Sequence, residues 1–172
     1  MSSETDVKGH PAESTAVELE LSISGDDSAE STVRVHADSG DSLEKFAARI
    51  TESAQLDGDA VLEVALGVEL PERQRFVRDL AFRHKKLRLR RTCIDLHFES
   101  EQKKHNFPAD AHWSAVHRWG CRHFNVSHDA CANLELRAGS STGAPLNEHQ
   151  KIGHAKECKT VWMVKPGPEP NG

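Results

Sequence analysis

The chain has 172 residues and a mass of 19.0 kDa, which suits one ordinary domain or two small ones. Hydrophobic residues make up 37% and charged residues 28%, enough for one or two compact cores, which excludes a fully disordered chain. The net charge of −5 is segregated, because residues 1–70 are strongly acidic, 71–91 are strongly basic and 92–172 are balanced. No apolar run is long enough to span a bilayer, and 1–15 lack the apolar stretch of a secretory signal, so we expect a cytoplasmic protein.

The first half begins with a tail and a predicted β-hairpin. Residues 1–15 are rich in Ser, Thr and Glu and are predicted to be disordered. Apolar and polar residues then alternate over 17–23 and 32–37, on either side of a polar turn, which predicts two paired strands.

A helix, a strand, a short helix and another strand are expected to complete the first half. Asp41 is a candidate N-cap, with Glu44 completing a capping box. The helix would bury one face, formed by Leu43, Phe46, Ala47 and Ile50. Residues 61–66 are predicted to form a strand, and 85–90 alternate as another. Between them Pro71 would open a short helix whose inward residues are Phe76, Val77 and Leu80.

The second half repeats this order more loosely. A strand is predicted at 92–98, a weaker one at 99–107, then a helix that opens at Pro108. Its apolar residues recur at helical spacing: Trp113, Val116, Gly120 and Phe124. Strands at 131–136 and 160–164 would follow, separated by a polar connection. The repeat predicts two units, 16–91 and 92–165, and a flexible Pro/Gly-rich tail over 166–172.

This order of elements resembles the ubiquitin-like β-grasp fold. Residues 134–137, 144–146, 151–153 and 161–164 resemble the latter half of bacterial ubiquitin-like domains, and 86–91 resemble the basic final strand of ubiquitin. Two such units in tandem are similar to the two-domain, interferon-induced ubiquitin-like modifier of vertebrates and to its bacterial counterparts. The resemblance implies an α+β fold of two tandem ubiquitin-like β-grasp domains, each with a mixed sheet packed on one helix.

The resemblance also implies a function, because the bacterial counterparts are encoded with conjugation enzymes in anti-phage operons. The expected partners are a ubiquitin-activating-like enzyme, a ubiquitin-conjugating-like enzyme, a deconjugating protease and target proteins such as phage structural proteins. The chain would be no enzyme and need no cofactor, since it would supply only the carboxylate of Gly172. It departs from the usual pattern by ending in Pro-Asn-Gly instead of a Gly pair.

The tail has physical properties that suit conjugation. A terminal residue without a side chain lets an adenylate and then a thiolate approach its carbonyl. Prolines at 166, 168 and 170 favour an extended form. At ~3.1 Å per residue, the seven-residue tail would reach roughly 20 Å from the last strand. The residues expected to contact partner enzymes are Arg88, Arg90, Trp162, Lys165, Pro166 and Asn171.

The cysteines and histidines of the second half offer other chemistry. In a chain expected to be cytoplasmic, the four cysteines are predicted to be reduced thiols or metal ligands. Two thiols and two imidazoles (His117, Cys121, His128, Cys131) form a set that zinc accepts, but their spacing matches no usual zinc module, so no metal site is assigned. Catalysis by Cys121 or Cys131 with His123 or His128 would need a third orienting group, and none is evident.

Two further alternatives depend on exposed side chains. The basic run 83–91 could bind nucleic acid, but Leu87 and Leu89 alternate with its arginines and no aromatic is interleaved, so nucleic-acid binding is not expected. Trp113 fits the core face of its helix. Trp119 and Trp162 are expected to lie outside that face, where they would either pack between the halves or anchor a partner.

The main alternative to a modifier is a β-grasp adaptor that binds partners without conjugation.

Overall fold

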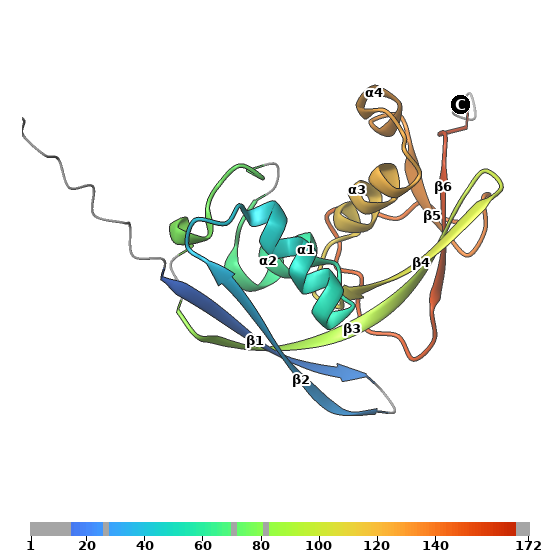
Figure 1. Cartoon of the computed structure of the whole chain (residues 1–172). Helices are drawn as coiled ribbons and strands as arrows, with labels where there is room; N and C mark the ends of the chain where they lie inside the picture. Colours follow the sequence, from blue (N-terminus) through green and yellow to red (C-terminus); the bar gives the residue numbers. More distant parts are fainter. Residues whose placement is uncertain (1–14, 26–27, 70–71, 81–82, 168–172) are drawn as a thin grey trace, which may run out of the picture.

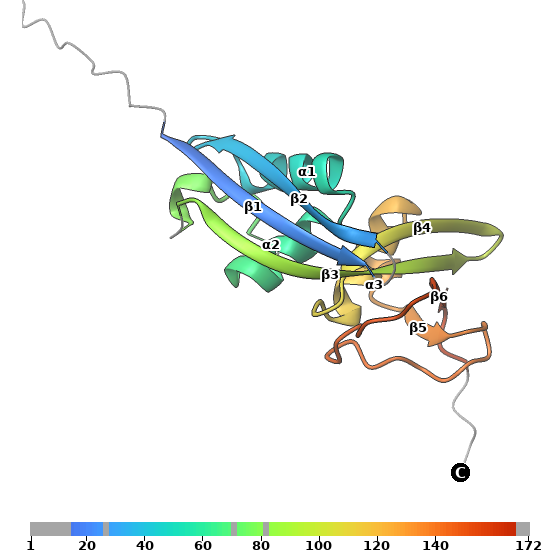
Figure 2. The same ribbon diagram turned by 90° about the horizontal axis from the view of Figure 1, so that it is seen from below.

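The computed structural model describes residues 15–25, 28–69, 72–80 and 83–167, which form an α+β fold with a mixed six-stranded sheet and four α-helices (Figures 1 and 2). In chain order the elements are β1 (Ala16–Gly25), β2 (Ser28–Asp38), α1 (Leu43–Ala54), α2 (Gly58–Leu66), the 3-10 turn η1 (Val77–Asp79), β3 (Lys85–Phe98), β4 (Glu101–Pro108), α3 (Trp113–His123), α4 (His128–Cys131), β5 (Glu135–Ala138) and β6 (Lys159–Val164). The arrangement is compatible with a β-grasp.

The sheet is organised around the long strand β3. Its strand order is β2-β1-β3-β6-β5, and β4 also pairs with β3. Residues 85–90 of β3 run parallel to β1, whereas 91–98 pair antiparallel with β4 and 94–98 run parallel to β6. The strands predicted at 85–90 and 92–98 are therefore one continuous strand, which Figure 2 shows crossing the molecule. The expected boundary between 91 and 92 lies inside it.

Two hydrophobic clusters lie along this sheet, one in each half. The first joins alternate residues of β1, such as Leu19 and Leu21, to the predicted face of α1. The second joins β3, β5 and β6 to α3, around Val116. Val64 of α2 packs against both clusters. The alternation in β1 and the apolar face of α1 are confirmed, and α2 connects the two cores.

The predicted strand at 61–66 is wrong, because these residues lie in α2. The Asp57 side chain accepts a hydrogen bond of 2.7 Å from the Ala60 N–H and caps the helix start. Gly67 ends the helix in the left-handed region with φ 63°. A short apolar run has no period that separates a buried strand from a buried helix, and here both caps favour the helix.

Other local predictions need smaller corrections. Ser42, not Asp41, caps α1, and the Asp41 carboxylate instead pairs with Lys45 and Arg49. The short helix is the single turn η1, and Phe76 beside it is 39% exposed, although Val77 and Leu80 are buried as expected. Pro71 lies outside the described residues.

In the second half the weak prediction at 99–107 is confirmed as β4, and the closing strand is confirmed as β6. The strand predicted at 131–136 begins later, at Glu135, because α4 occupies His128–Cys131. The predicted tail 1–15 lies almost entirely outside the described residues.

Candidate functional site

The end of β6 leads into the segment that the sequence predicts to carry a reactive carboxylate. Val161 and Met163 point into the core, so Trp162 lies on the opposite face of the sheet. Lys165 and Pro166 follow the strand and are exposed. Residues 168–172, which include Asn171 and Gly172, lie outside the described residues, so the conjugation site itself stays a prediction.

Trp162 is half-buried because it stacks on a histidine of the neighbouring strand. His97 is its register partner on β3, and the two ring centroids are 4.7 Å apart. Arg137 of β5 is the partner on the other side. We call His97, Trp162 and Arg137 the outer-face patch. The sequence singled out Trp162 but not its neighbours, which strand register alone brings together.

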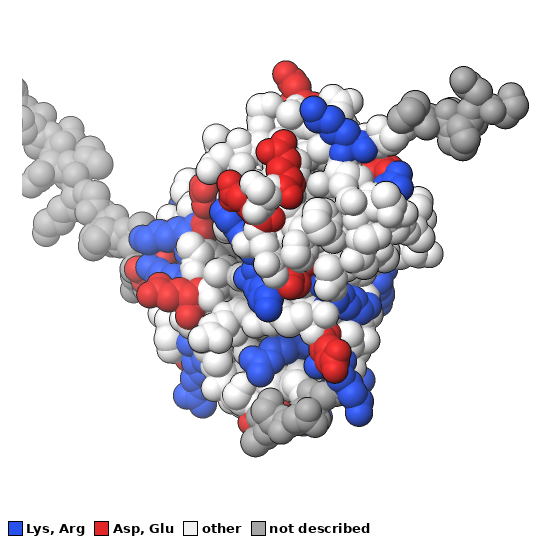
Figure 3. Space-filling view, turned by 90° about the vertical axis from the view of Figure 1, so that its right-hand side faces the viewer, with Lys and Arg blue, Asp and Glu red and all other residues white. Residues whose placement is uncertain are grey.

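Two basic side chains of the predicted basic strand lie beside acidic side chains of the hairpin. Arg88 and Arg90 are exposed on β3, far along the strand from Trp162, but Arg88 lies 3.8 Å from Glu30. Lys86 similarly lies 3.4 Å from Glu20 of β1. Red and blue side chains are also interspersed on the face shown in Figure 3. These pairs reduce the attraction of this strand for a polyanion.

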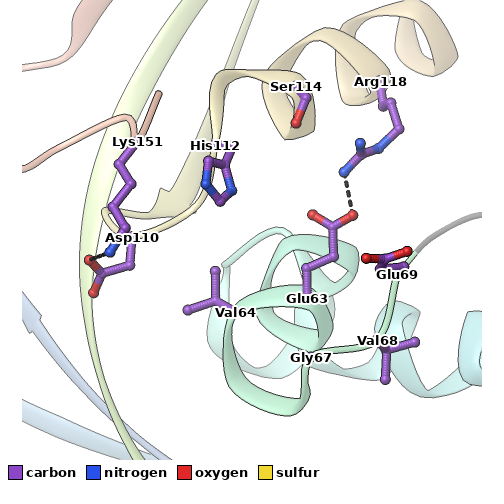
Figure 4. A pocket seen from close by; sticks show the side chains of 10 residues that line it. All are labelled: Glu63, Val64, Gly67, Val68, Glu69, Asp110, His112, Ser114, Arg118 and Lys151. Atoms are coloured by element: carbon purple, nitrogen blue, oxygen red, sulfur yellow. Dashed lines mark hydrogen bonds and ion pairs between the residues drawn. The ribbon is translucent and has the colours of Figure 1, made fainter. Parts of the chain in front are cut away.

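An open groove of about 600 Å³ lies between α2 and the start of α3 (Figure 4). One wall comes from α2 and the residues after it, including Glu63 and Val64, and the other from the segment before and within α3, including His112 and Ser114. An ion pair of 2.5 Å from Arg118 to Glu63 crosses the groove. Its lining combines apolar side chains with charges of both signs, which suits a polar peptide segment. No sequence pattern pointed to this groove.

A cluster of aromatic rings and histidines occupies the junction between α2, β4 and α3. The ring of Trp119 stacks on His105 at 4.9 Å and on His123 at 4.3 Å. Trp119 is 4% exposed and packs between the halves, which was one of its two expected roles, and Trp113 is buried as expected. Trp119 is thus buried in the cluster, whereas His123 is exposed at its edge.

Two ionisable groups of this junction titrate abnormally. Burial raises the pKa of the Asp57 carboxyl to about 6. Burial also lowers the pKa of His105 to about 4, and its Nε2 lies 3.9 Å from an Asp57 oxygen. Burial thus shifts both groups toward their neutral forms, as expected in a poorly hydrated contact between elements, although a carboxyl with a pKa of about 6 is still mostly ionised at neutral pH.

All four cysteines are paired in disulfides, so the prediction of reduced thiols is wrong. Cys93 bonds to Cys158, and Cys121 bonds to Cys131. Strand register explains the first bond. Ile94 of β3 is paired with Lys159 of the parallel strand β6, so the residues before them, Cys93 and Cys158, also lie side by side. The second bond joins α3 to α4.

The histidines predicted beside these cysteines separate into two groups. His117 lies on α3 with its Nε2 3.9 Å from the Cys131 sulfur, and its other ring nitrogen lies 3.1 Å from Glu148. His128 on α4 is exposed and is not part of this cluster. Because both sulfurs are bonded, neither Cys121 nor Cys131 is a free nucleophile in this structure. Glu148, in a polar connection, carried no sequence signal.

No protein-family profile matches the chain, and no curated protein is detectably similar to it. Among the described residues, no helix is both long enough and apolar enough to cross a membrane.

Proposed function

We propose that the chain is a tandem ubiquitin-like β-grasp protein that is attached to target proteins through Gly172. The observation that carries this proposal is the course of β6. It lies parallel to β3 within the order β4-β3-β6-β5 and leads directly into the exposed residues 165–167. A strand held on both sides gives a firm base from which a short extended tail can enter a deep enzyme site.

The chemistry needs only the terminal carboxylate of this chain. An activating enzyme would join the Gly172 carboxylate to the α-phosphate of ATP and release pyrophosphate. A cysteine thiolate would then displace AMP to give a thioester. A conjugating enzyme would pass the acyl group to a target lysine amine, which forms an isopeptide bond and frees the thiol. A deconjugating protease would hydrolyse that bond.

The surfaces that would meet these enzymes lie on β3 and β6. The outer-face patch presents a stacked Trp162, and tryptophan is enriched at binding hot spots. Arg88 and Arg90 lie on the part of β3 that pairs with β1, so they would belong to a separate contact. The first half would thus add recognition while the second half presents the tail.

The cellular setting belongs to the same proposal and rests on resemblance: bacterial anti-phage defence in the cytoplasm, with phage structural proteins among the targets. The two disulfides favour an oxidising compartment instead, because cytosolic thiol buffers keep most cysteines reduced.

A non-conjugated adaptor is the second candidate. The groove between α2 and α3 favours it, because a peptide held there would need no reaction at Gly172. In that case the tail would be dispensable and the outer-face patch would be one of several binding surfaces.

Mass spectrometry of host proteins separates the two candidates. The Lys165–Pro166 bond resists trypsin. Cleavage after Lys159 should therefore leave the remnant TVWMVKPGPEPNG on the target lysine of a conjugate. We expect the remnant with the unaltered chain and its loss when Gly172 is deleted. Gly167→Ala is the matched control, since an added Cβ there meets no atom within 4 Å, and it should leave the corresponding remnant with alanine in place of that glycine. Partner capture that survives deletion of Gly172, with no remnant from the unaltered chain, would overturn the modifier in favour of the adaptor.

A further inference from the structure

The described residues hold one cluster in which three metal-binding side chains converge, around the Cys121–Cys131 disulfide. Single ligand atoms of His117, Cys121 and Cys131 all lie within 4.8 Å of one another. His117 and Cys121 lie four residues apart on α3 and so share a face, while Cys131 ends α4. Two sulfurs and one imidazole form the kind of mixed set that binds zinc.

The environment of His117 is organised as in metal-binding histidines. Its Nε2 faces the Cys131 sulfur at 3.9 Å, and its Nδ1 lies 3.1 Å from a Glu148 carboxylate oxygen. A carboxylate on the far ring nitrogen fixes the tautomer that presents Nε2 as an acceptor. The side chain of His117 is 11% exposed, so the ring has little freedom to turn away.

The spacing of the cluster permits coordination once the disulfide is cut. The Cα atoms of the two cysteines are 5.8 Å apart. Thiolates bound to one zinc ion stand roughly 3.8 Å from each other, and a thiolate and an imidazole nitrogen roughly 3.6 Å, by tetrahedral geometry. Rotation about the Cα–Cβ bonds of the two cysteines can bring their sulfurs to the first of these distances. The second is close to the 3.9 Å that already separates His117 Nε2 from the Cys131 sulfur.

We propose that reduction of the Cys121–Cys131 disulfide creates a zinc site of two thiolates and His117. A phosphine or dithiol reductant donates two electrons to the S–S bond, which yields two thiols as the reductant is oxidised. Zn²⁺ then displaces the two thiol protons and accepts an electron pair from each sulfur and from Nε2. Water fills the fourth position, because His128 lies outside the cluster.

The site would keep α4 fastened to α3 under either redox condition. The disulfide provides this link in an oxidising compartment, and the metal would replace it where thiols are reduced. The inference does not depend on conjugation through Gly172, so either can fail without the other.

Cobalt binding tests the inference on the full chain. Co²⁺ bound to thiolates gives a sulfur-to-metal charge-transfer band, so we would titrate Co²⁺ into oxidised and phosphine-reduced protein. We expect about one equivalent to bind with this band after reduction, competition by Zn²⁺, and no band before reduction. His117→Gln should weaken binding by more than tenfold, and Glu148→Gln, which removes only the positioning carboxylate, by about tenfold.

Matched variants separate this pair from the other disulfide. The double variant C93S/C158S should keep the band after reduction, whereas C121S/C131S should lose it. H128Q is the histidine control and should bind as the unaltered chain does. Reduced unaltered protein without the band, although folded by circular dichroism, would overturn the inference. So would an unchanged band in reduced C121S/C131S or in H117Q.

Discussion

At the scale of single residues, the most unusual contact is that of Asp57 with His105. The Asp57 residue is 4% exposed, yet its carboxylate is the N-cap of α2 and lies 3.9 Å from Arg122. His105 Nε2 is buried without a hydrogen-bond partner. The helix cap needs an acceptor oxygen but not a charge, because the neutral amide of Asn caps as well as Asp does. Burial of the Asp57 charge therefore destabilises the folded protein and is not needed for the helix cap.

Replacing Asp57 by Asn should make the protein more stable at neutral pH. With a folded pKa near 6 and an unfolded value of 3.8, the folded chain binds the extra proton between these values. Stability of the unaltered protein therefore falls as the pH rises from about 4 to about 6 and stays lower above that. We expect Asp57→Asn to gain about 2 kcal/mol at pH 7.5 and almost nothing at pH 3.5.

Urea unfolding at several pH values measures this difference. His105 titrates in the same window with the opposite sign, because its pKa is lowered, but it does so in both proteins and largely cancels. Asp57→Ala is the control, since it removes the charge together with the cap and should lose about 1 kcal/mol relative to Asn. An equal gain at both pH values, or none at pH 7.5, would contradict the assignment.

At the scale of elements, the contact between α1 and α2 depends on one glycine. A Cβ added at Gly58 would lie 1.9 Å from the Ala47 carbonyl oxygen, which belongs to the backbone of α1. The Thr51 hydroxyl reinforces this contact, because it donates to that carbonyl and accepts from the Gly58 N–H. A rigid helix backbone cannot move aside as a flexible side chain would.

The substitution Gly58→Ala should therefore destabilise the fold by about 3 kcal/mol, at the upper end of the usual cost of overpacking. Thermal or urea unfolding measures the change. Gly40→Ala is the matched control, because a Cβ there meets no atom within 4 Å, and it should change stability by less than about 0.5 kcal/mol. Equal stability of the two variants would show that α2 is not held closely against α1.

The elements also show what the sequence could predict. Strict alternation predicted β1 and β2, and a 3.6-residue period predicted α1 and α3, because one buried face imposes those periods. The run 61–66 was ambiguous because it is short and packs against two cores. The split of β3 at 91 followed from the assumption of two closed units. A strand shared by two cores needs no turn at that point.

Prediction of the candidate sites was limited by tertiary placement. The four cysteines and His117 were identified, but pairing depends on the parallel register of β3 and β6 and on the position of α4. Glu148 and the groove between α2 and α3 come from segments without periodicity. Residues that act through distant neighbours leave no local pattern in the sequence.

At the scale of the whole molecule, the two halves are physically continuous. Strand β3 pairs with β1 in one half and with β4 and β6 in the other. Val64 contacts both clusters, and the Arg118–Glu63 ion pair joins α3 to α2. A substitution that destabilises the first hydrophobic cluster should therefore also destabilise the second.

Leu21→Ala tests this coupling. Leu21 is fully buried in the first cluster, so the substitution should cost about 3 kcal/mol. All three tryptophans belong to the second half, and Trp119 also lies at its junction with α2, so their fluorescence reports mainly on the second half. We expect the fluorescence and far-ultraviolet circular dichroism transitions to shift together to lower urea concentration.

The control is Glu52→Ala at an exposed position of α1, which should leave both transitions unchanged. A fluorescence transition that stays fixed while circular dichroism shifts or becomes biphasic would instead mean that β3 tolerates unfolding of one half, and that the tail-bearing half is stable alone.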